Sequence, residues 1–493
     1  MHGGVDPSSA VDLPLASGTT GHFGRMFAAA NPADAEYLAK LERLGQSLLQ
    51  EGDSEGKFGR NRIAAGYTYF GQLIAHDLSF DHMPFAECGE YEAEQIPNAR
   101  TPWLDLDQIY GGGPERSPQL YEGDKRAERF RIVNDCDLPR GERYKLSGDQ
   151  AERLPRPDLR DLENVIVLQL HVLFMRLHNA AIDQQLGCGI PEVEREDGTL
   201  FNKAARLVRW QYQWLVRNDL LPKLLDPNVA VRVRTFGPQF QWPRGKFFIP
   251  IEFSAAVFRF GHSMVRPKYR LNSDVAVTFQ DLADPRWAIE PLRSELKIAW
   301  KRFFHRGPPP PAPAFGIDTR ITPELGAVSA FASHAMRGKT DASSPPMPHH
   351  GQHFALPVRT LQRGASMRLP SGQALVRQLG LEAKLLTAQQ LCGATDTADS
   401  DRSGSVLAES GLVDETPLFY YILREAEMEP YCADRLGPAG SQIVADVIEG
   451  AFRHDPDSYW RFATRWKPPE WKFPAGPARQ INVMGDLIAA LGE

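Results

Sequence analysis

The sequence predicts a mainly α-helical protein with little β-structure. Apolar residues recur at helical spacing in several long segments, whereas a strand-like pattern occurs in one short piece, at residues 246–251. No repeat period runs through the chain. Its 493 residues, 42% of them hydrophobic, are enough for a sizeable core and allow one large or two to three ordinary domains.

Composition excludes several classes of function. A formal net charge of −6 and a pI near 6.1 give no electrostatic footprint for nucleic acid or an anionic membrane. No apolar run reaches the roughly 18 residues of a membrane span, and residues 1–18 do not form a secretory signal. The five cysteines are scattered, which argues against a disulfide framework and a zinc site. We expect a cytoplasmic setting by default, with non-classical secretion as the alternative.

The first sixty residues are expected to form an arm and a wrapping helix, near residues 32–51, ahead of the main domain at 61–493. The segment Tyr67–Asp81 is then the first to suggest chemistry. Its apolar residues have helical spacing, and the same period places Gln72 and His76 one turn apart on one face. A buried imidazole and amide need partners, so His76 is either a satisfied core histidine or a functional group.

Residues 82–157 form an irregular, acidic region rich in proline and glycine, and loops of that length are usually functional. An extended backbone would direct Thr101, Asp105 and Asp107 to the same side. Calcium takes six to eight oxygen ligands, and Asp77 is positioned to complete such a set. The alternative is a solvated acidic turn.

A long helix is expected over Arg160–Asp183, with Arg160 and Glu163 in its first turn. The two residues form either a surface ion pair or a buried helix start at which Arg160 addresses an anion. We interpret His171 and His178, seven residues apart on this helix, as structural. A further helix is expected over residues 204–217.

His262 ends an apolar helical run over residues 251–265. A neutral imidazole on an apolar wall, beside Gly261, fits a metal or haem ligand or, equally, a core position. The cluster of His349, His350 and His353 has transition-metal ligands but no nearby acids or cysteines, so its role stays open. Helices are also expected near the C-terminus, one of them over residues 440–452.

Together these stretches resemble the animal-type haem peroxidases of the peroxidase–cyclooxygenase superfamily, and the chain looks like a bacterial member. The resemblance covers about residues 59–460. Its motifs, in order, are FGQLIAHD, TPWLDLDQIYGG, LRDLENVIVLQLHVLFMRLHN, FRFGHSMVRP, LQRGASMRLPSG and RLGPAGSQIVADVIEG. The order of the motifs carries the signal, because none of them alone would be specific.

The resemblance implies a single large helical domain with haem b between the His76 and His262 segments. It implies that His76 is the distal histidine, Arg160 the distal arginine and Gln72 a distal-pocket amide. His262 is implied to be the proximal iron ligand. A base at His76 would move a proton between the two oxygens of hydrogen peroxide, and Arg160 would stabilise the negative charge that develops there.

The same resemblance implies a structural calcium ion and two contacts to the haem propionates. Its calcium ligands would be Asp77, Thr101, Asp105, Asp107 and the carbonyl of Trp103. A cation that holds Asp77 would also hold the neighbouring His76. The propionate contacts would come from Arg259 and Arg363, whose guanidinium groups suit carboxylates.

Four positions bear on the covalent and proximal chemistry of the family. The ester-forming aspartate before the distal histidine is Ala75 here, while the second ester-forming acid is kept as Glu163, so at most one ester link is expected. Asn164 replaces the sulfonium-forming methionine of one subgroup. The asparagine that usually bonds the proximal histidine aligns with Thr360, whose hydroxyl can also accept a hydrogen bond.

The function implied by the resemblance is peroxidase activity, in a response to oxidative stress. Hydrogen peroxide would be reduced, and small organic donors or the halides and pseudohalides bromide, iodide and thiocyanate would be oxidised. The first alternative is a fatty-acid dioxygenase of the same superfamily, but its oxidising tyrosine would stand where this chain has Arg259. The second is a haem-binding protein without turnover, which the presence of His76, Gln72 and Arg160 together disfavours.

Overall fold

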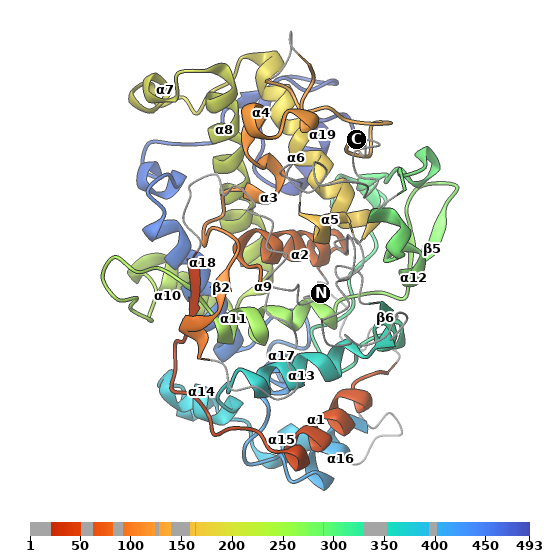
Figure 1. Ribbon diagram of the computed structural model, residues 1–493, viewed down its shortest axis with the longest axis vertical. Coiled ribbons are helices and arrows are strands. Elements are labelled where there is room, and N and C mark those ends of the chain that lie inside the picture. The colour runs from red at the N-terminus through yellow and green to blue at the C-terminus, as the bar shows by residue number, and fades with distance from the viewer. Residues whose placement is uncertain are drawn as a thin grey trace, which may run out of the picture.

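The protein is built mainly from α-helices, as the sequence predicts (Figure 1). The computed structural model describes residues 21–50, 63–81, 92–123, 128–139, 158–162, 164–288, 290–329, 353–393 and 402–493. The longer helices are α1 (Ala35–Ser47), α2 (Gly66–Leu78), α6 (Val165–Gln184), α8 (Leu200–Leu215), α10 (Pro227–Phe236), α13 (Leu356–Ser366), α17 (Leu418–Glu427) and α18 (Pro438–His454). The shorter ones are α3 (Asp107–Tyr110), α4 (Gly113–Arg116), α5 (Leu159–Leu162), α7 (Pro191–Asp197), α9 (Leu221–Leu224), α11 (Ile251–Ala255), α12 (Phe279–Leu282), α14 (Gly372–Gln378), α15 (Ala388–Cys392), α16 (Arg402–Glu409) and α19 (Met484–Ala490).

The strands are short and lie at the edges of the helical body. One three-stranded sheet has the order β2-β1-β3, with β1 antiparallel to β2 and parallel to β3. The remaining strands form two-stranded antiparallel pairs. The strands are β1 (Gly21–Gly24), β2 (Pro97–Asn98), β3 (Ile249–Pro250), β4 (Lys268–Arg270), β5 (Ala276–Thr278), β6 (Val328–Ser329), β7 (His353–Phe354), β8 (Glu470–Trp471) and β9 (Arg479–Gln480).

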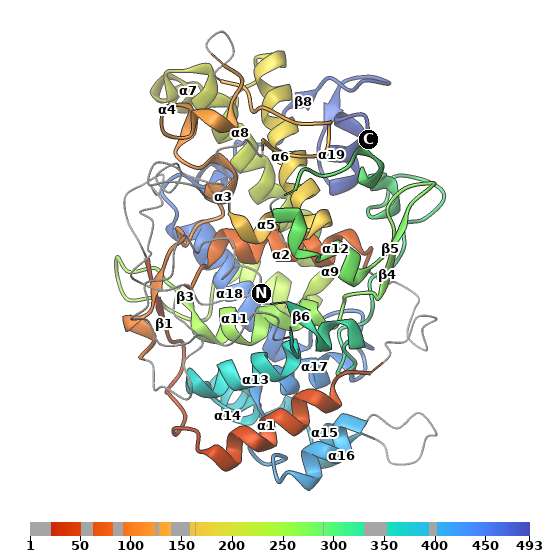
Figure 2. The ribbon, with the colours of Figure 1, turned by 45° about the vertical axis from the view of Figure 1, so that its right-hand side comes forward.

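Helix α2 crosses the middle of the molecule in both ribbon views (Figures 1 and 2). Its apolar residues at helical spacing, Phe70, Leu73 and Ile74, are fully buried, as the periodicity predicts. The Phe70 ring packs on Phe174 of α6, with ring centroids 6.3 Å apart, and on Tyr212 of α8, at 6.0 Å. These contacts hold one side of α2 firmly and leave its other side for the polar residues at positions 72 and 76.

The prediction of one continuous helix over Arg160–Asp183 is wrong at its start. Residues 159–162 form the separate short helix α5, and α6 begins at Val165. Asn164 is the N-cap of α6, with extended backbone dihedrals (φ −141°, ψ 126°) and a side chain that accepts from Ile166 N. Because of this break, Arg160 and Asp161 belong to α5 and not to the first turn of α6.

Helix α6 has the length and hydropathy of a membrane span, unlike any other helix in the described part of the chain. In its most apolar window, 89% of the residues are buried inside the molecule. That is the environment of a core helix, consistent with its packing between α2 and α8.

Helix α1 lies along α13 at one end of the molecule (Figures 1 and 2). The two helices cross closely at Gly45, where an added Cβ would stand 2.5 Å from Val358 Cα. A glycine is therefore required at this crossing. A wrapping helix was predicted in this part of the sequence, whereas the expected boundary at residue 60 lies outside the described residues.

The predicted helical run over residues 251–265 is broken. Helix α11 ends at Ala255, Ala256 leaves helical geometry (φ −135°, ψ −67°), and residues Val257–His262 form a 3-10 helix, η7. The strand-like piece before it supplies β3, and the predicted helices at 204–217 and 440–452 are confirmed as α8 and α18. Of the histidine cluster, His349 and His350 lie outside the described residues, and the His353 backbone opens β7.

Candidate functional site

A cavity separates α2 from α11 and η7. Its α2 wall includes Gln72 and His76, and its opposite wall includes Arg259 and His262, so four of the predicted site residues line the same space. Gly71 and Gly261 lie on facing walls, and a Cβ at either would meet no atom within 4 Å. The absence of side chains at these two points gives the cavity the form of a slot, which suits a flat group.

His76 is held from behind and has one free nitrogen at the cavity. Its side chain is 2% exposed, and Nδ1 lies 2.8 Å from Asp161 Oδ1. Its Nε2 is buried and has no hydrogen-bond partner among the described residues. Burial and the nearby Arg160 cation lower the pKa of His76, and Asp161 opposes the shift only in part. At neutral pH the imidazole is therefore neutral and able to take a proton.

Arg160 supports His76 from outside the cavity. Its Nη2 donates to His76 O at 2.8 Å and its Nη1 to Ser79 O at 2.7 Å, so it holds the last turn of α2. Its Nε and Nη2 also bind Asp158, at 2.6–3.1 Å, and the guanidinium stacks on Phe80. Arg160 is 1% exposed and is not among the cavity-lining residues. It acts on the site as a buried charge and a backbone clamp.

His262 faces the cavity without a protein partner on its second nitrogen. Its Nδ1 is buried and makes no hydrogen bond within the described part of the chain. The expected partner, Thr360, instead donates from its hydroxyl to Leu356 O at 2.8 Å, within α13. The structure therefore does not bring Thr360 and His262 together through a hydrogen bond. Burial and Arg259 lower the pKa of His262 well below its ordinary value, so the imidazole is neutral.

The two arginines expected to meet carboxylates differ in their surroundings. Arg259 lines the cavity, and its Nε donates to Ser254 O at 3.0 Å. Burial, together with Arg359, lowers the pKa of Arg259 to about 10, and no carboxylate in the described ranges pairs with it. Arg363 pairs with Asp81 through Nη2, just beyond α2, and does not line the cavity. A charged group with no counter-ion at a cavity wall is suited to an anionic ligand.

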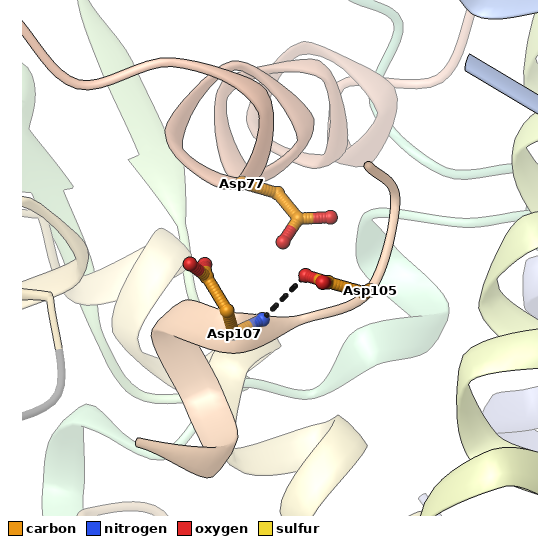
Figure 3. A group of neighbouring side chains, drawn as sticks. All are labelled: Asp77, Asp105 and Asp107. Carbon is orange, nitrogen blue, oxygen red and sulfur yellow. Dashed lines mark hydrogen bonds between the residues drawn. The ribbon is translucent and has the colours of Figure 1, made fainter. Parts of the chain in front are cut away.

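Three carboxylates meet on the side of α2 that faces away from the cavity. Asp77, Asp105 and Asp107 each offer an oxygen within 4.8 Å of the others (Figure 3). Thr101 joins them, because its Oγ1 donates to Asp105 Oδ2 at 2.8 Å. The loop is not extended as expected. Leu106 adopts a left-handed conformation (φ 60°), and this turn makes the two loop aspartates converge.

The charges of this acidic cluster are balanced only in part, because Arg100 pairs with Asp107 at 3.4 Å. Both carboxylate oxygens of Asp77 are buried without a partner among the described residues. Burial and the neighbouring aspartates raise the pKa of Asp77 well above its ordinary value. Burial likewise raises the pKa of Asp105 to about 6 and that of Asp107 to about 7. Three carboxylates and a hydroxyl, with both Asp77 oxygens lacking a partner among the described residues, are hard oxygen donors of the kind that Ca²⁺ takes, so the residues fit that ion.

Two further predicted positions stay untested by the geometry. Glu163 lies outside the described residues. The Trp103 ring stacks on Phe247, with centroids 5.1 Å apart, and its carbonyl remains a predicted calcium ligand.

Sequence reasoning missed the buried acids that organise the site. Asp161 bonds His76, and Asp158 bonds both Arg160 and Arg100, the latter through Nη2 at 2.5 Å. Arg100 also reaches Asp107 Oδ1 at 3.4 Å, which links the acidic cluster to Arg160. The one available signal was the density of charged residues at positions 158–163. A buried arginine needs a counter-ion, so neighbouring carboxylates are candidates for its partners.

Comparisons with known proteins find relatives of part of this chain. Residues 74–294 match the model of the animal haem peroxidase family. A peroxidase-like protein of Margaritifera margaritifera is 27% identical over 191 residues, 34% of this chain and 22% of that protein. Thyroid peroxidase of Rattus norvegicus is 29% identical over 215 residues, 40% of this chain and 22% of that protein. The matches thus span about a fifth of the length of these relatives.

Solved structures share the fold over most of the chain. Peroxidase A of Dictyostelium discoideum has a TM-score of 0.56 at 17% identity and is covered over 90% of both chains. Fatty acid alpha-dioxygenase of Oryza sativa has a TM-score of 0.58 at 14% identity, over 92% of this chain and 80% of that one. At these identities the likeness concerns the fold alone. The family model and the curated relatives show that part of this chain is similar to animal haem peroxidases.

Proposed function

We propose that this protein is a haem peroxidase, which reduces hydrogen peroxide and oxidises small organic donors or bromide, iodide and thiocyanate. One observation carries the proposal. His76 and His262 line opposite walls of one slot-like cavity, each neutral and each with a ring nitrogen that makes no hydrogen bond to the described residues. A neutral base facing a neutral metal ligand is the pair of groups that peroxide reduction at a haem requires.

The residues of the proximal wall would hold the cofactor. His262 would ligate the iron of haem b, and Arg259 would pair with a propionate, which would supply the carboxylate partner that it lacks. Haem supplies, when bound, the two electrons that break the oxygen–oxygen bond of the peroxide. Glu163 is proposed to form one ester link to the haem. Complete extraction of haem by acidified acetone from protein pre-treated with peroxide would contradict that link.

The residues of the distal wall would handle the proton. His76 Nε2 would take a proton from one peroxide oxygen and return it to the other, which leaves as water. Gln72 lies one turn before His76 on the same cavity wall, where its amide would orient the peroxide or a halide. Arg160 would act through His76, because its charge disfavours imidazolium and its hydrogen bond fixes the His76 backbone.

The acidic cluster is proposed to bind a structural Ca²⁺. Asp77, Asp105, Asp107 and Thr101 would supply oxygen ligands, together with the Trp103 carbonyl. Asp77 directly precedes the end of α2 and follows His76, so a cation held there would also fix the catalytic imidazole. Elemental analysis of protein purified without chelator tests this, since absence of bound calcium would contradict it.

A fatty-acid dioxygenase is the second candidate, because solved dioxygenases share the fold over 92% of this chain. Arg259 occupies the position of the expected oxidising tyrosine. Tyr67 does line the cavity, but its hydroxyl donates to Asp219 at 2.7 Å, which together with burial raises its pKa. Oxygen uptake by the haem-loaded protein with palmitate separates the two: uptake without peroxide supports the dioxygenase.

Steady-state oxidation of a phenolic donor tests the proposal itself. Haem-loaded protein is expected to oxidise the donor only when hydrogen peroxide is present, and bromide, iodide and thiocyanate are compared under the same conditions. Protein that binds haem but consumes neither peroxide nor fatty acid would instead be a haem-binding protein without turnover.

A further inference from the structure

One buried carboxylate is shared by two buried histidines. Asp161 Oδ1 lies 2.8 Å from His76 Nδ1, and Asp161 Oδ2 lies 2.8 Å from His171 Nδ1. The carboxylate is fully buried, and the two imidazoles are 2% and 1% exposed. The three side chains come from α5, α2 and α6, so the arrangement ties three helices together behind the cavity wall.

The arrangement restricts where the ring protons lie. An ionised carboxylate only accepts hydrogen bonds, so each Nδ1 that contacts it must carry the proton. Burial alone would raise the pKa of Asp161, but the hydrogen bonds from His171 and His76 outweigh it, and the carboxyl stays ionised. A neutral His76 with its proton on Nδ1 has its lone pair on Nε2, the nitrogen that has no hydrogen-bond partner among the described residues.

His171 prevents the carboxylate from turning away. Without His171, Asp161 Oδ2 would be a buried charged oxygen that lacks a hydrogen-bond donor. The free-energy cost of that state would favour rotation or protonation of the Asp161 carboxyl. His171 is fixed in α6, whose neighbouring residues are fully buried in the core. The position of His76 is therefore restrained by α6 through two hydrogen bonds, from His171 to Asp161 and from His76 to Asp161, each 2.8 Å long.

We propose that Asp161 is a positioning residue that fixes His76 in the Nδ1-protonated form, and that His171 anchors Asp161 for this task. The proposal rests on the proposed peroxidase function, because it assigns the orientation of the proton-transferring group. His171, which the sequence suggested to be structural, belongs to this triad.

The first test compares rates in haem-loaded variants. An Asp161→Asn amide has one acceptor oxygen and cannot accept from both histidines, so one hydrogen bond or one tautomer must change. We expect the second-order rate constants for hydrogen peroxide and for cyanide, whose acid form must also lose a proton, to fall by about 10- to 100-fold. His171→Leu should lower both by about tenfold, and His171→Asn, which restores a donor, should recover most of the loss.

Asp446→Asn is the matched control. Asp446 is also fully buried and also accepts with both oxygens, from Gln239 N at 2.9 Å and Phe240 N at 3.0 Å, and none of its hydrogen bonds within the described ranges involves a histidine. It should lower thermal stability and leave both rate constants unchanged. The proposal is overturned if Asp161→Asn behaves in the same way, with lowered stability and wild-type rates in the haem-loaded fraction.

A second measurement needs no folded variant at position 161. Nitrogen-15 spectra of wild-type protein labelled at histidine, loaded with diamagnetic zinc protoporphyrin, report which ring nitrogen of His76 carries the proton; a His76→Ala spectrum assigns the signal. Protonation at Nδ1 is expected, and protonation at Nε2 overturns the proposal. The spectrum can also be recorded without porphyrin, so failure of haem binding or turnover would contradict the proposed function separately.

Discussion

The two walls of the cavity carry one histidine each, and the histidines are supported in opposite ways. On the α2 wall, His76 Nδ1 is fixed by Asp161, which is itself fixed by His171. On the η7 wall, His262 Nδ1 is buried and has no hydrogen-bond partner among the described residues, and Thr360 bonds its own helix. The His76 imidazole is oriented by protein hydrogen bonds, while the contacts of His262 in the described part of the chain are packing contacts, including the Phe419 ring with its centroid at 6.0 Å.

This difference matches the work proposed for each wall. A proton-transferring group must hold one tautomer through every turnover, so external hydrogen bonds are needed. A metal ligand is oriented by the metal itself, and a missing acceptor on its second nitrogen leaves it a weaker donor. We therefore expect His262 to donate less electron density to the haem iron than it would with an asparagine or carboxylate hydrogen-bonded to its second ring nitrogen.

The largest effect should come from removal of His76, the proposed distal base. His76→Ala should lower the second-order rate constant for hydrogen peroxide by about a thousandfold, within the range of general acid–base contributions. Haem affinity should change little, because the proximal wall is intact. Stopped-flow absorbance of the haem band measures the rate.

His178→Gln serves as the control for loss of a buried histidine. His178 bonds Tyr110 and Glu128 O outside the cavity, so its replacement should affect stability alone. A near-normal rate constant for hydrogen peroxide in His76→Ala would contradict the role of His76 as the proton-transferring group.

Removal of His262, the proposed iron ligand, should have the opposite pattern. His262→Ala should weaken haem binding by about a hundredfold, since no other imidazole lies on that wall among the described lining residues. Transfer of haem to an excess of apomyoglobin measures the retention. Equal haem loss in His76→Ala and His262→Ala would contradict the assigned roles.

Calcium should affect mainly the distal side, because Asp77 follows His76 in α2. Saturation at a hundredfold excess over Kd would stabilise the protein by about 2.7 kcal/mol. Asp105→Ala should remove this effect, and lower haem retention with it. Thermal unfolding with calcium or chelator measures the difference, and equal Tm values in both conditions would contradict the site.

The calcium effect should grow with pH. Burial raises the pKa of Asp105 to about 6 and that of Asp107 to about 7. Acids with a raised pKa in the folded state favour folding at low pH and lose that contribution as pH rises through the raised values. Chelated protein should therefore lose stability between about pH 4 and 7, while calcium-loaded protein, with its carboxylates already ionised, should not.

The smallest effect should come from Arg259. Arg259→Gln should weaken haem binding by about tenfold, equivalent to roughly 1.4 kcal/mol, because it removes the positive charge proposed to pair with a haem propionate. Arg259→Lys keeps the charge and should recover part of the affinity. Equilibrium haem titration distinguishes these outcomes, and wild-type affinity in both variants would exclude a propionate contact.

Periodicity predicted the helices whose faces are buried evenly. The i, i+3, i+4 pattern found α2, α8 and α18, because their apolar faces meet the core without interruption. The pattern missed the break before α6, because the N-cap residue Asn164 lies within a segment whose apolar residues keep helical spacing on both sides. It also missed the left-handed Leu106, because a leucine gives no signal for a positive φ.

At the site, four of the predicted residues line one cavity, whereas Arg160, Arg363 and Thr360 do not, and the sequence did not predict which atoms pair. His76, Gln72, Arg259 and His262 reach one cavity from segments almost two hundred residues apart. The partners of Arg160, by contrast, depend on backbone carbonyls and on Asp158, which no spacing rule identifies. The shared carboxylate of Asp161 was hidden for the same reason, because its two histidines lie on other helices.

The most direct measurement is the absorption spectrum of the protein titrated with haem and then mixed rapidly with hydrogen peroxide, with and without a phenolic donor or bromide. The account predicts saturable haem binding at one site, a spectral change within milliseconds to seconds of mixing that His76→Ala abolishes, and return of the first spectrum when donor is added. Absence of stoichiometric haem binding, or peroxide that only bleaches the haem at a rate independent of His76, would contradict it.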